Sequence, residues 1–283
     1  MGSGGCTPIP RPLCHCRVCE EARRKGIPYS RSGPSMFLND INVLFDTPED
    51  IAAQLNRENI EQLDAIFYTH WEPDHTLGMR IVEEINMYWL AKYVDGKEPE
   101  RKIAIYALEE VMSDLLSIKN RYGSYFKYYE SIGVASLNTL KDNAPLKINN
   151  LRITPISVKS NVTSTVFLIE EDDKKVIYAP CDVKPFPIAN TKLSNADVLI
   201  IGNVIPDGPL KDNYFVPQGN ELRYEMFSMK EIIEIKERLA VERVIITHIE
   251  EEWGKSFDDY KKLEQKYGQF NIKFAYDGMK IKL

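Results

Sequence analysis

The sequence predicts an α/β fold in which two mixed β-sheets pack face to face and helices cover the outer faces. Short apolar segments of strand length occur in clusters, helical segments lie singly between them, and no stretch rich in Gly, Pro or Ser divides the chain. With 43% apolar residues over 283 positions, the chain can bury a full core. We therefore expect one domain spanning residues 1–283, with a cysteine-rich loop at about residues 6–20.

In the N-terminal half, residues 35–46 are typical of two short strands joined by an Asn-Asp turn. Residues 47–49 are Thr, Pro and Glu, a combination that begins helices. Residues 63–69 form the next predicted strand, which places His70 at its carboxyl end, where ligands gather in layered α/β folds. The other elements expected here are a helix over residues 77–93, a strand over 103–107 and a helix over 108–118.

The C-terminal half is richer in predicted strands. Those over residues 165–169 and 175–179 are joined by an acidic turn, and a strand over 243–247 ends at His248. The further elements are strands over residues 151–158 and 198–202, helices over 229–239 and 258–267, and a closing strand pair near 272–283. The loop over residues 206–219 is the predicted mobile flap.

The charge balance limits the classes of function. With 36 Lys and Arg against 42 Asp and Glu, the net charge is −6, which argues against a protein that binds long nucleic acids through bulk electrostatics. No apolar run approaches the length of a membrane span and no leader pattern opens the chain, so we expect a cytoplasmic protein without membrane contact. A homodimer remains compatible with this composition.

Three of the five cysteines, Cys14, Cys16 and Cys19, fall within six residues. Without a secretion signal, such close spacing favours a metal site over a disulfide framework, the alternative being three reduced, buried thiols. Three thiolates leave one position of a structural zinc unfilled, because such sites take four ligands.

The segment after the strand over residues 63–69 carries two imidazoles and two carboxylates. His70, Glu72, Asp74 and His75 lie within six residues, and a short turn can direct all four into one pocket. A polar turn with a helix-capping aspartate is the alternative, but such a turn does not require this combination of side chains. We therefore predict a metal site here.

The pattern His70-x-Glu72-x-Asp74-His75 resembles the HxHxDH signature of the metallo-β-lactamase superfamily, whose αββα sandwich matches the predicted element order. The N-terminal glycines, the cysteine cluster, the Gly-Pro-Ser of residues 33–35 and the Tyr-Asp-Gly-Met of residues 276–279 are similar to the PhnP-like branch. That branch contains cyclic phosphodiesterases that also carry a structural zinc. The resemblance spans nearly the whole chain.

The resemblance implies further ligands. Asp182, which follows a strand, matches the bridging aspartate of the family, and His248 matches its last histidine. The first metal would have His70, Glu72 and Asp182, and the second metal would have the following ligands: Asp74, His75, Asp182 and His248. Glu72 replaces a histidine, and the middle histidine of the family falls at Lys159 and Ser160, which become candidates for substrate binding. A harder ligand set favours Mn²⁺ or Fe²⁺ relative to Zn²⁺, with one or two ions bound.

The same branch places the fourth ligand of its structural zinc three residues after the last active-site histidine. That position is Glu251 in this chain, which makes it the first candidate, ahead of His15 and Cys6. The expected structural zinc site therefore comprises Cys14, Cys16, Cys19 and Glu251.

These observations predict a metal-dependent hydrolase that cleaves a small or cyclic phosphodiester with a metal-bound hydroxide. Asp74, Asp182 and His248 would be its catalytic residues. The alternative is a non-catalytic binding or scaffold protein whose first metal site has degenerated. A redox domain of the flavodiiron type shares the HxExDH form but requires a flavodoxin partner, and no such domain follows in this sequence.

Overall fold

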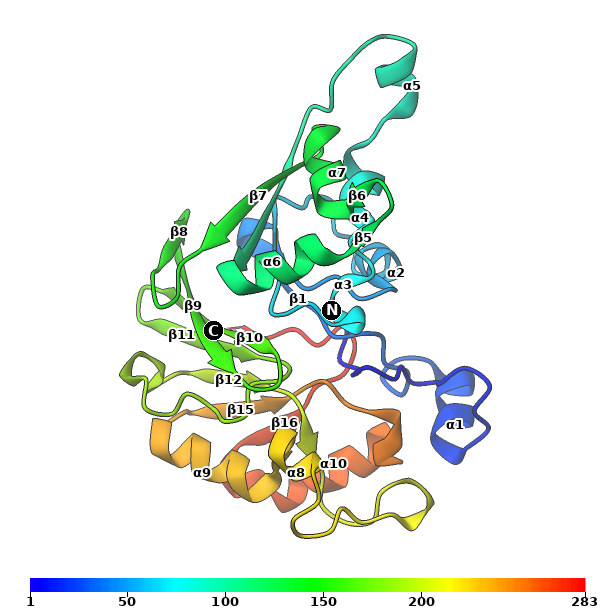
Figure 1. Cartoon of the computed structure of the whole chain (residues 1–283). Coiled ribbons are helices and arrows are strands. Elements are labelled where there is room, and N and C mark those ends of the chain that lie inside the picture. Colours follow the sequence, from blue (N-terminus) through cyan, green and yellow to red (C-terminus); the bar gives the residue numbers. More distant parts are fainter. Residues whose placement is uncertain (283) are drawn as a thin grey trace.

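The computed structural model describes residues 1–282 and contains two mixed β-sheets packed face to face, with helices on the outer faces (Figure 1). In spatial order, the first sheet holds β1 (Met36–Leu38), β2 (Val43–Phe45), β3 (Ala65–Phe67), β4 (Ile103–Leu108) and β7 (Ala135–Leu140). The second holds β16 (Ile272–Phe274), β15 (Arg243–Ile246), β12 (Val198–Ile201), β11 (Lys174–Ala179), β10 (Thr163–Glu171), β9 (Leu151–Lys159) and β8 (Leu146–Ile148). The predicted sandwich is confirmed.

The strand directions place the functional loops at one side of the molecule. In the first sheet, β1 and β2 are antiparallel, and the remaining neighbours are parallel. In the second sheet, β8 to β11 form an antiparallel meander, whereas β11, β12, β15 and β16 run parallel. Parallel strands align their carboxyl ends, so the loops that follow them meet along one edge of each sheet.

The helices separate into two outer layers. Helices α6 (Glu109–Ser117) and α7 (Tyr125–Ser131) cover the first sheet, and α9 (Met229–Leu239) and α10 (Phe257–Lys266) cover the second (Figure 1). The others are α1 (Arg17–Lys25), α2 (Ile51–Arg57), α3 (Pro73–Thr76), α4 (Ile81–Asn86), α5 (Trp89–Tyr93) and α8 (Leu222–Glu225). Two short ladders join β5 (Lys119–Asn120) to β6 (Gly123–Ser124) and β13 (Val204–Ile205) to β14 (Phe227–Ser228).

An aromatic cluster joins the two sheets. The Phe45 ring of the first sheet has its centroid 5.2 Å from that of Phe167 and 5.3 Å from that of Tyr178, both in the second sheet. All three side chains are almost fully buried. Truncating a buried Phe lowers the free energy of unfolding by about 3–5 kcal/mol. This cluster therefore contributes substantially to the stability of the sheet packing, which fixes the relative positions of the loops.

Several predicted elements need correction. Helix α2 begins at Ile51 rather than at residues 47–49, because the Thr47 hydroxyl lies 2.8 Å from the Tyr68 hydroxyl in the core and does not cap a helix. The helix predicted over residues 77–93 is interrupted and becomes α4 and α5. No side chain of α5 is buried, since this segment protrudes from the sheets (Figure 1).

The closing strand pair is also incorrect within the described residues. Only β16 forms there, residues 275–282 contain no strand, and position 283 lies outside the described part of the chain. Strand β7 was not predicted, because its Ala-Ser-Leu-Asn-Thr-Leu sequence has weak apolar alternation. Within residues 1–282, no helix has both the length and the apolar character required to span a bilayer.

Candidate metal centre

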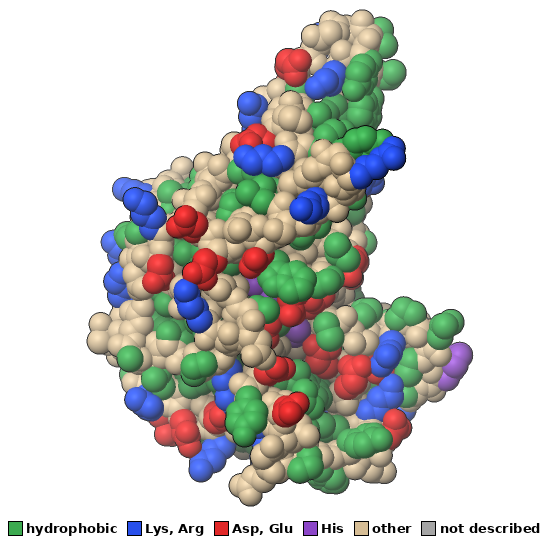
Figure 2. Space-filling model, viewed as in Figure 1, with side chains coloured by type: hydrophobic (Ala, Val, Ile, Leu, Met, Phe, Trp, Pro, Cys, Tyr) green, Lys and Arg blue, Asp and Glu red, His purple; other side chains and the backbone are tan. Residues whose placement is uncertain are grey.

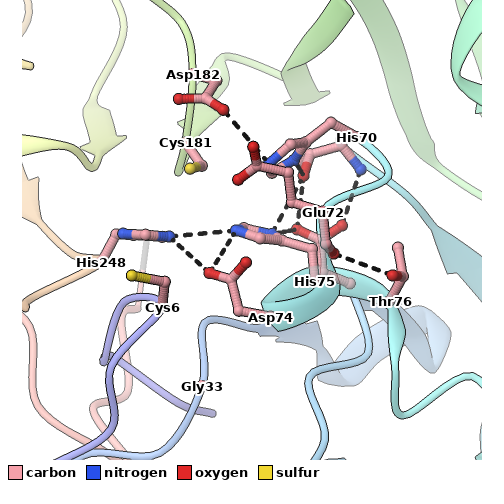
Figure 3. Close-up of polar contacts among 12 residues, drawn as sticks. Cys6, Gly33, His70, Glu72, Asp74, His75, Thr76, Cys181, Asp182 and His248 are labelled. Carbon is pink, nitrogen blue, oxygen red and sulfur yellow. Dashed lines mark hydrogen bonds and ion pairs between the residues drawn. The ribbon is translucent and has the colours of Figure 1, made fainter. Parts of the chain in front are cut away.

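Loops from both sheets bring the predicted ligands together at one place. His70 follows β3 of the first sheet, whereas Asp182 and His248 follow β11 and β15 of the second sheet. In the close-up, these side chains point toward one another from opposite layers, with Glu72, Asp74 and His75 between them (Figure 3). Strand β12 lies between β11 and β15, and because all three run parallel, Asp182 and His248 follow strands that end at the same edge of the sheet.

A tight turn presents the four ligands that follow β3. Pro73 stands at the first position of α3, a place where its missing N–H costs nothing. The His75 N–H donates to the Glu72 carbonyl at 2.9 Å, and the Thr76 hydroxyl donates to the same carbonyl at 3.0 Å. This single helical turn reverses the chain, so Glu72 and His75 both face the centre (Figure 3).

Asp46 orients His75 from outside the ligand set. Its Oδ2 lies 2.9 Å from His75 Nδ1, and its two oxygens accept bonds from the backbone N–H and the hydroxyl of Thr69, each at 2.8 Å. A carboxylate on one ring nitrogen of a ligating histidine directs the other nitrogen to the metal. Asp46 ends the segment predicted as two short strands, and no local pattern in the sequence indicates its contact with His75, 29 residues away.

His248 is held between two carboxylates. Its Nε2 lies 3.2 Å from Asp74 Oδ2 and 3.2 Å from His75 Nε2, and its Nδ1 lies 3.2 Å from Glu250 Oε1. Gly5 packs directly on this pair, because a Cβ there would meet Glu250 Oε1 at 2.0 Å and His248 Nδ1 at 2.7 Å. Gly5 therefore has a steric function at the site.

The site strongly perturbs the ionisation of its side chains. Burial acts against ionised Asp74, but the bond from His248 and the charge of His75 outweigh it and lower the pKa of Asp74. Burial and the charge of Cys181 raise the pKa of Asp182 to about 7. Burial and His70 act to lower the pKa of His75, yet Asp46 overcomes both and raises it to about 9. Such opposed shifts within a cavity are typical of functional sites.

The donor atoms form two main groups that suit metal ions, and a third group, made of His70, His75 and Cys181, overlaps with both. The first contains one ligand atom each from His70, Glu72, Cys181 and Asp182, all within 4.8 Å of one another. The second contains the corresponding atoms of the following residues: Asp74, His75 and His248. His70 Nε2 is fully buried and has no hydrogen-bond partner among the described residues. A buried imidazole nitrogen that has no hydrogen-bond partner within such a group of donors is suited to coordinate a metal ion.

Two further contacts involve Asp182 and its neighbour. Asp182 lies in the first group, and Asn203 Nδ2 donates to its Oδ1 at 3.0 Å. Cys181, which directly precedes Asp182 in the sequence, also lies among the ligands. Burial acts against its ionisation, but the charges of His248 and His70 lower the pKa of the thiol well below its usual value.

A cavity of about 200 Å³ is lined by Glu72, Cys181 and Asp182 of the first group and by His248 of the second group. In the space-filling view, histidine and acidic side chains are visible in a hollow near the middle of the molecule (Figure 2). Ser160, the other residue predicted to bind substrate, lines this cavity. Lys159 does not line it, because its side chain turns to the neighbouring surface and its Nζ pairs with Glu110 Oε1 at 2.7 Å.

The structure also brings together the four predicted ligands of the cysteine site. Glu251 Oε1 lies 3.4 Å from the sulfur of Cys14, 3.1 Å from that of Cys16 and 3.4 Å from that of Cys19. The other two candidates lie elsewhere. The His15 side chain is 83% exposed and contacts Glu20. Cys6 instead donates to Glu250 Oε2 at 3.4 Å, beside the active-site cavity.

Lys211 is an unforeseen member of the cysteine site. Its Nζ lies 2.6 Å and 2.8 Å from the two oxygens of Glu251 and 3.4 Å from the sulfur of Cys14. Although burial acts in the opposite direction, this ammonium lowers the pKa of Glu251 to about 2. Because Glu250 contacts His248 and Glu251 contacts the cysteines, two consecutive residues connect the two sites.

Metal affinity is expected to rise with pH. Metal ligands must be deprotonated, and the metal-free site retains protons on Asp182 below its pKa of about 7 and on His75 below its pKa of about 9. Each displaced proton contributes about tenfold in apparent affinity per pH unit. Between pH 7 and pH 9, competition with a chelating dye should therefore show tighter binding by about tenfold per unit or more, and a flat profile would contradict these protonation states.

A comparison with known proteins finds one family profile that matches most of this chain. The sequence profile described as the beta-lactamase superfamily domain matches residues 41–249, a range that contains all the active-site ligand candidates. Among curated proteins, an octanoyltransferase of Porphyromonas gingivalis (strain ATCC BAA-308 / W83) is 27% identical over 163 residues, which are 56% of this chain and 30% of that protein. Because the match spans less than a third of that relative, its activity is not carried over to this chain.

Solved structures share the fold over the whole chain. A diphosphatase from the PhnP family has a TM-score of 0.72 at 22% identity, covering 100% of this chain and 95% of that chain. Zn²⁺-bound PqqB from Methylobacterium extorquens has a TM-score of 0.72 at 18% identity, and the match covers 100% of this chain and 98% of that chain. The short form of human tRNase Z has a TM-score of 0.61 at 14% identity, and the match covers 99% of this chain and 96% of that chain. At these identities the likeness concerns the fold.

Proposed function

Because this chain belongs to the metallo-β-lactamase superfamily, we propose that it is a metal-dependent hydrolase and, more narrowly, a phosphodiesterase for a small or cyclic phosphodiester. The observation that carries the proposal is the pair of ligand groups beside one cavity, in which the buried His70 Nε2 has no hydrogen-bond partner among residues 1–282. The PhnP-family diphosphatase shares this fold and supports the choice of phosphorus chemistry.

The residues present define how the site would work. His70, Glu72 and Asp182 would hold one divalent ion, and the following residues would hold a second: Asp74, His75 and His248. When bound, these ions supply Lewis acidity for phosphoryl oxygens and acidify water near neutral pH. The free oxygen of Asp74 would accept a hydrogen bond from the attacking water and orient it.

A group that lines the cavity would have to donate a proton to the leaving oxygen. Lys159 does not line the cavity, because its Nζ pairs with Glu110 Oε1 on another surface. Asp182, as a ligand of the first ion, would lose its proton when the metal binds. Glu250 lines the cavity with its Oε1 3.2 Å from His248 Nδ1, and the bond from His248 outweighs the effect of burial and lowers the pKa of Glu250, so the pair of His248 and Glu250 is our candidate for this transfer.

The cavity favours a compact substrate. Its volume of about 200 Å³ is below the range of about 300–1,000 Å³ that is usual for pockets of drug-sized ligands. Its lining includes the carboxylates of Glu72, Asp182, Glu225 and Glu250, and the net charge of the chain is −6. A long polyanion would be repelled by this surface, whereas a single phosphodiester needs only the charge of the bound metal.

A phosphodiester assay tests the proposal directly. Purified protein loaded separately with Mn²⁺, Fe²⁺, Zn²⁺ or Ni²⁺ should release p-nitrophenol from bis(p-nitrophenyl) phosphate at a rate at least about tenfold above that from the monoester, p-nitrophenyl phosphate. Inorganic diphosphate and a 2′,3′-cyclic nucleotide serve as further substrates. Absence of turnover of every substrate with all four metals would overturn the proposal.

A non-catalytic binding module is the second candidate, and one observation favours it. Lys184 is the lysine that lines the cavity, and its Nζ is already engaged by Glu231 Oε1 at 2.6 Å and by the carbonyls of Arg223 and Met226. Among the residues that the structure describes, the cavity lining therefore offers no free ammonium for a phosphate. Metal bound at the cysteine site but absent from the active-site ligands would favour this second function.

A further inference from the structure

Cys181 occupies a position inside the ligand cluster that its sequence context did not reveal. It ends the segment after β11, is 3% exposed, and directly precedes Asp182. Its sulfur lies within 4.8 Å of ring nitrogens of His70 and His75, and also of carboxylate oxygens of Glu72 and Asp182. Figure 3 shows the thiol among these side chains and not turned into a separate apolar pocket.

The position of the missing histidine supplies no replacement ligand. The superfamily signature places that histidine at residues 159–161, at the end of β9. Lys159 is paired with Glu110, and the Ser160 hydroxyl donates to the carbonyl of Val162 at 3.2 Å. A first metal held by His70, Glu72 and Asp182 would therefore lack a fourth donor unless a different segment provided one.

The unpaired Nε2 of His70 also indicates a metal position next to Cys181. His70 Nε2 is completely buried and without a hydrogen-bond partner in the described chain, and its nearest acidic neighbours are Glu72 Oε2 at 3.5 Å and Asp182 Oδ2 at 3.8 Å. Those separations are too long for hydrogen bonds but suit atoms that share one ion between them. The Cys181 sulfur completes this set as a fourth donor.

We propose that the Cys181 thiolate is a ligand of the first metal, together with His70, Glu72 and Asp182, and takes over the role of the absent histidine. This inference rests on the proposed metal-dependent function. On binding, the sulfur–hydrogen bond breaks, the proton leaves to solvent and a sulfur–metal bond forms without any change of oxidation state. The resulting set has one sulfur, one nitrogen and two oxygens, which fits a tetrahedral site.

The thiolate changes the expected metal preference. Replacing imidazole by the Glu72 carboxylate makes the site harder, but a sulfur donor makes it softer and restores affinity for Zn²⁺ or Fe²⁺ over Mn²⁺. The backbone keeps this donor in place, because the Ser164 hydroxyl donates to the Cys181 carbonyl at 2.9 Å. Asn203 fixes the adjacent Asp182 through its bond to Oδ1.

Cobalt spectroscopy tests the assignment without relying on activity. In Co²⁺-loaded protein, Cys181→Ser should lose about one quarter of the sulfur-to-cobalt charge-transfer intensity, because the three thiolates of the cysteine site remain. Cys6→Ser is the matched control, since Cys6 also lines the cavity but belongs to neither ligand group, and it should retain the full intensity. An unchanged spectrum in Cys181→Ser, with cobalt still bound at the active site, would overturn the inference.

A crystal of the metal-loaded wild-type protein provides a readout that is independent of any substitution. Anomalous scattering should place an ion about 2.3 Å from the Cys181 sulfur. An ion held by His70 with that sulfur more than about 3 Å away would refute the thiolate ligand and leave the proposed hydrolase intact. Absence of any ion from both ligand groups would instead overturn the proposed function together with this inference.

Discussion

Replacing Asp74 with alanine is expected to abolish hydrolysis and remove one equivalent of metal. Asp74 is one of three donors in its group, and its Oδ2 lies 3.2 Å from His248 Nε2. Without this carboxylate, the imidazoles of His75 and His248, only 3.2 Å apart, lose the negative charge that compensates the metal. Replacing a residue that only hydrogen-bonds to a metal ligand lowers metal affinity or activity by about 10–100-fold. Loss of a ligand itself should therefore lower kcat by about 1,000-fold or more.

The measurement combines initial rates on bis(p-nitrophenyl) phosphate with metal content by mass spectrometry. Asp173→Ala is a suitable control, because Asp173 is exposed in the turn between β10 and β11, and this variant should keep both rate and metal. Wild-type turnover in Asp74→Ala would show that the second ligand group is not the catalytic one. Metal retention with lost turnover would assign Asp74 to orienting the water.

Substituting Cys19 with serine is expected to destabilise the protein strongly. Cys19 is fully buried in α1, and its sulfur lies 3.4 Å from Glu251 Oε1, so a zinc at this position would tie the N-terminal segment to the loop after β15. Structural zinc contributes directly to the free energy of folding. A loss of about 3–5 kcal/mol, the scale of a broken buried charged network, corresponds to a fall in Tm of roughly 10 °C in a domain of this size.

Thermal unfolding with and without a zinc chelator checks this expectation. The chelator should lower the Tm of the wild-type protein but have little further effect on Cys19→Ser. Cys6→Ser is again the control, because Cys6 is exposed and lies away from the cysteine cluster. An equal Tm for wild type and Cys19→Ser would contradict a structural metal. Because Glu250 and Glu251 are adjacent, a rise in KM of Cys19→Ser would show that the two sites are coupled.

Much of the fold could be predicted because its signals are local. Apolar runs and turn residues located β9, β10 and β11, and the helix predicted over residues 229–239 has the bounds of α9, Met229–Leu239. The predictions failed where local preference competed with distant contacts. Thr47 has the sequence context of a helix cap, yet its hydroxyl contacts the Tyr68 hydroxyl in the core. The apolar periodicity over residues 77–93 continues across the break between α4 and α5, so it predicts one helix where the structure has two.

The sequence by itself determined the superfamily, the turn that carries His70, Glu72, Asp74 and His75, and the cysteine cluster, because each depends on spacing within a few residues. Only the tertiary structure decided the other partners. Asp46 meets His75, Cys181 joins the group of His70, and Lys211 reaches Glu251 across separations of 29, 111 and 40 residues. Such contacts depend on how the two sheets are stacked and registered, which no local pattern encodes.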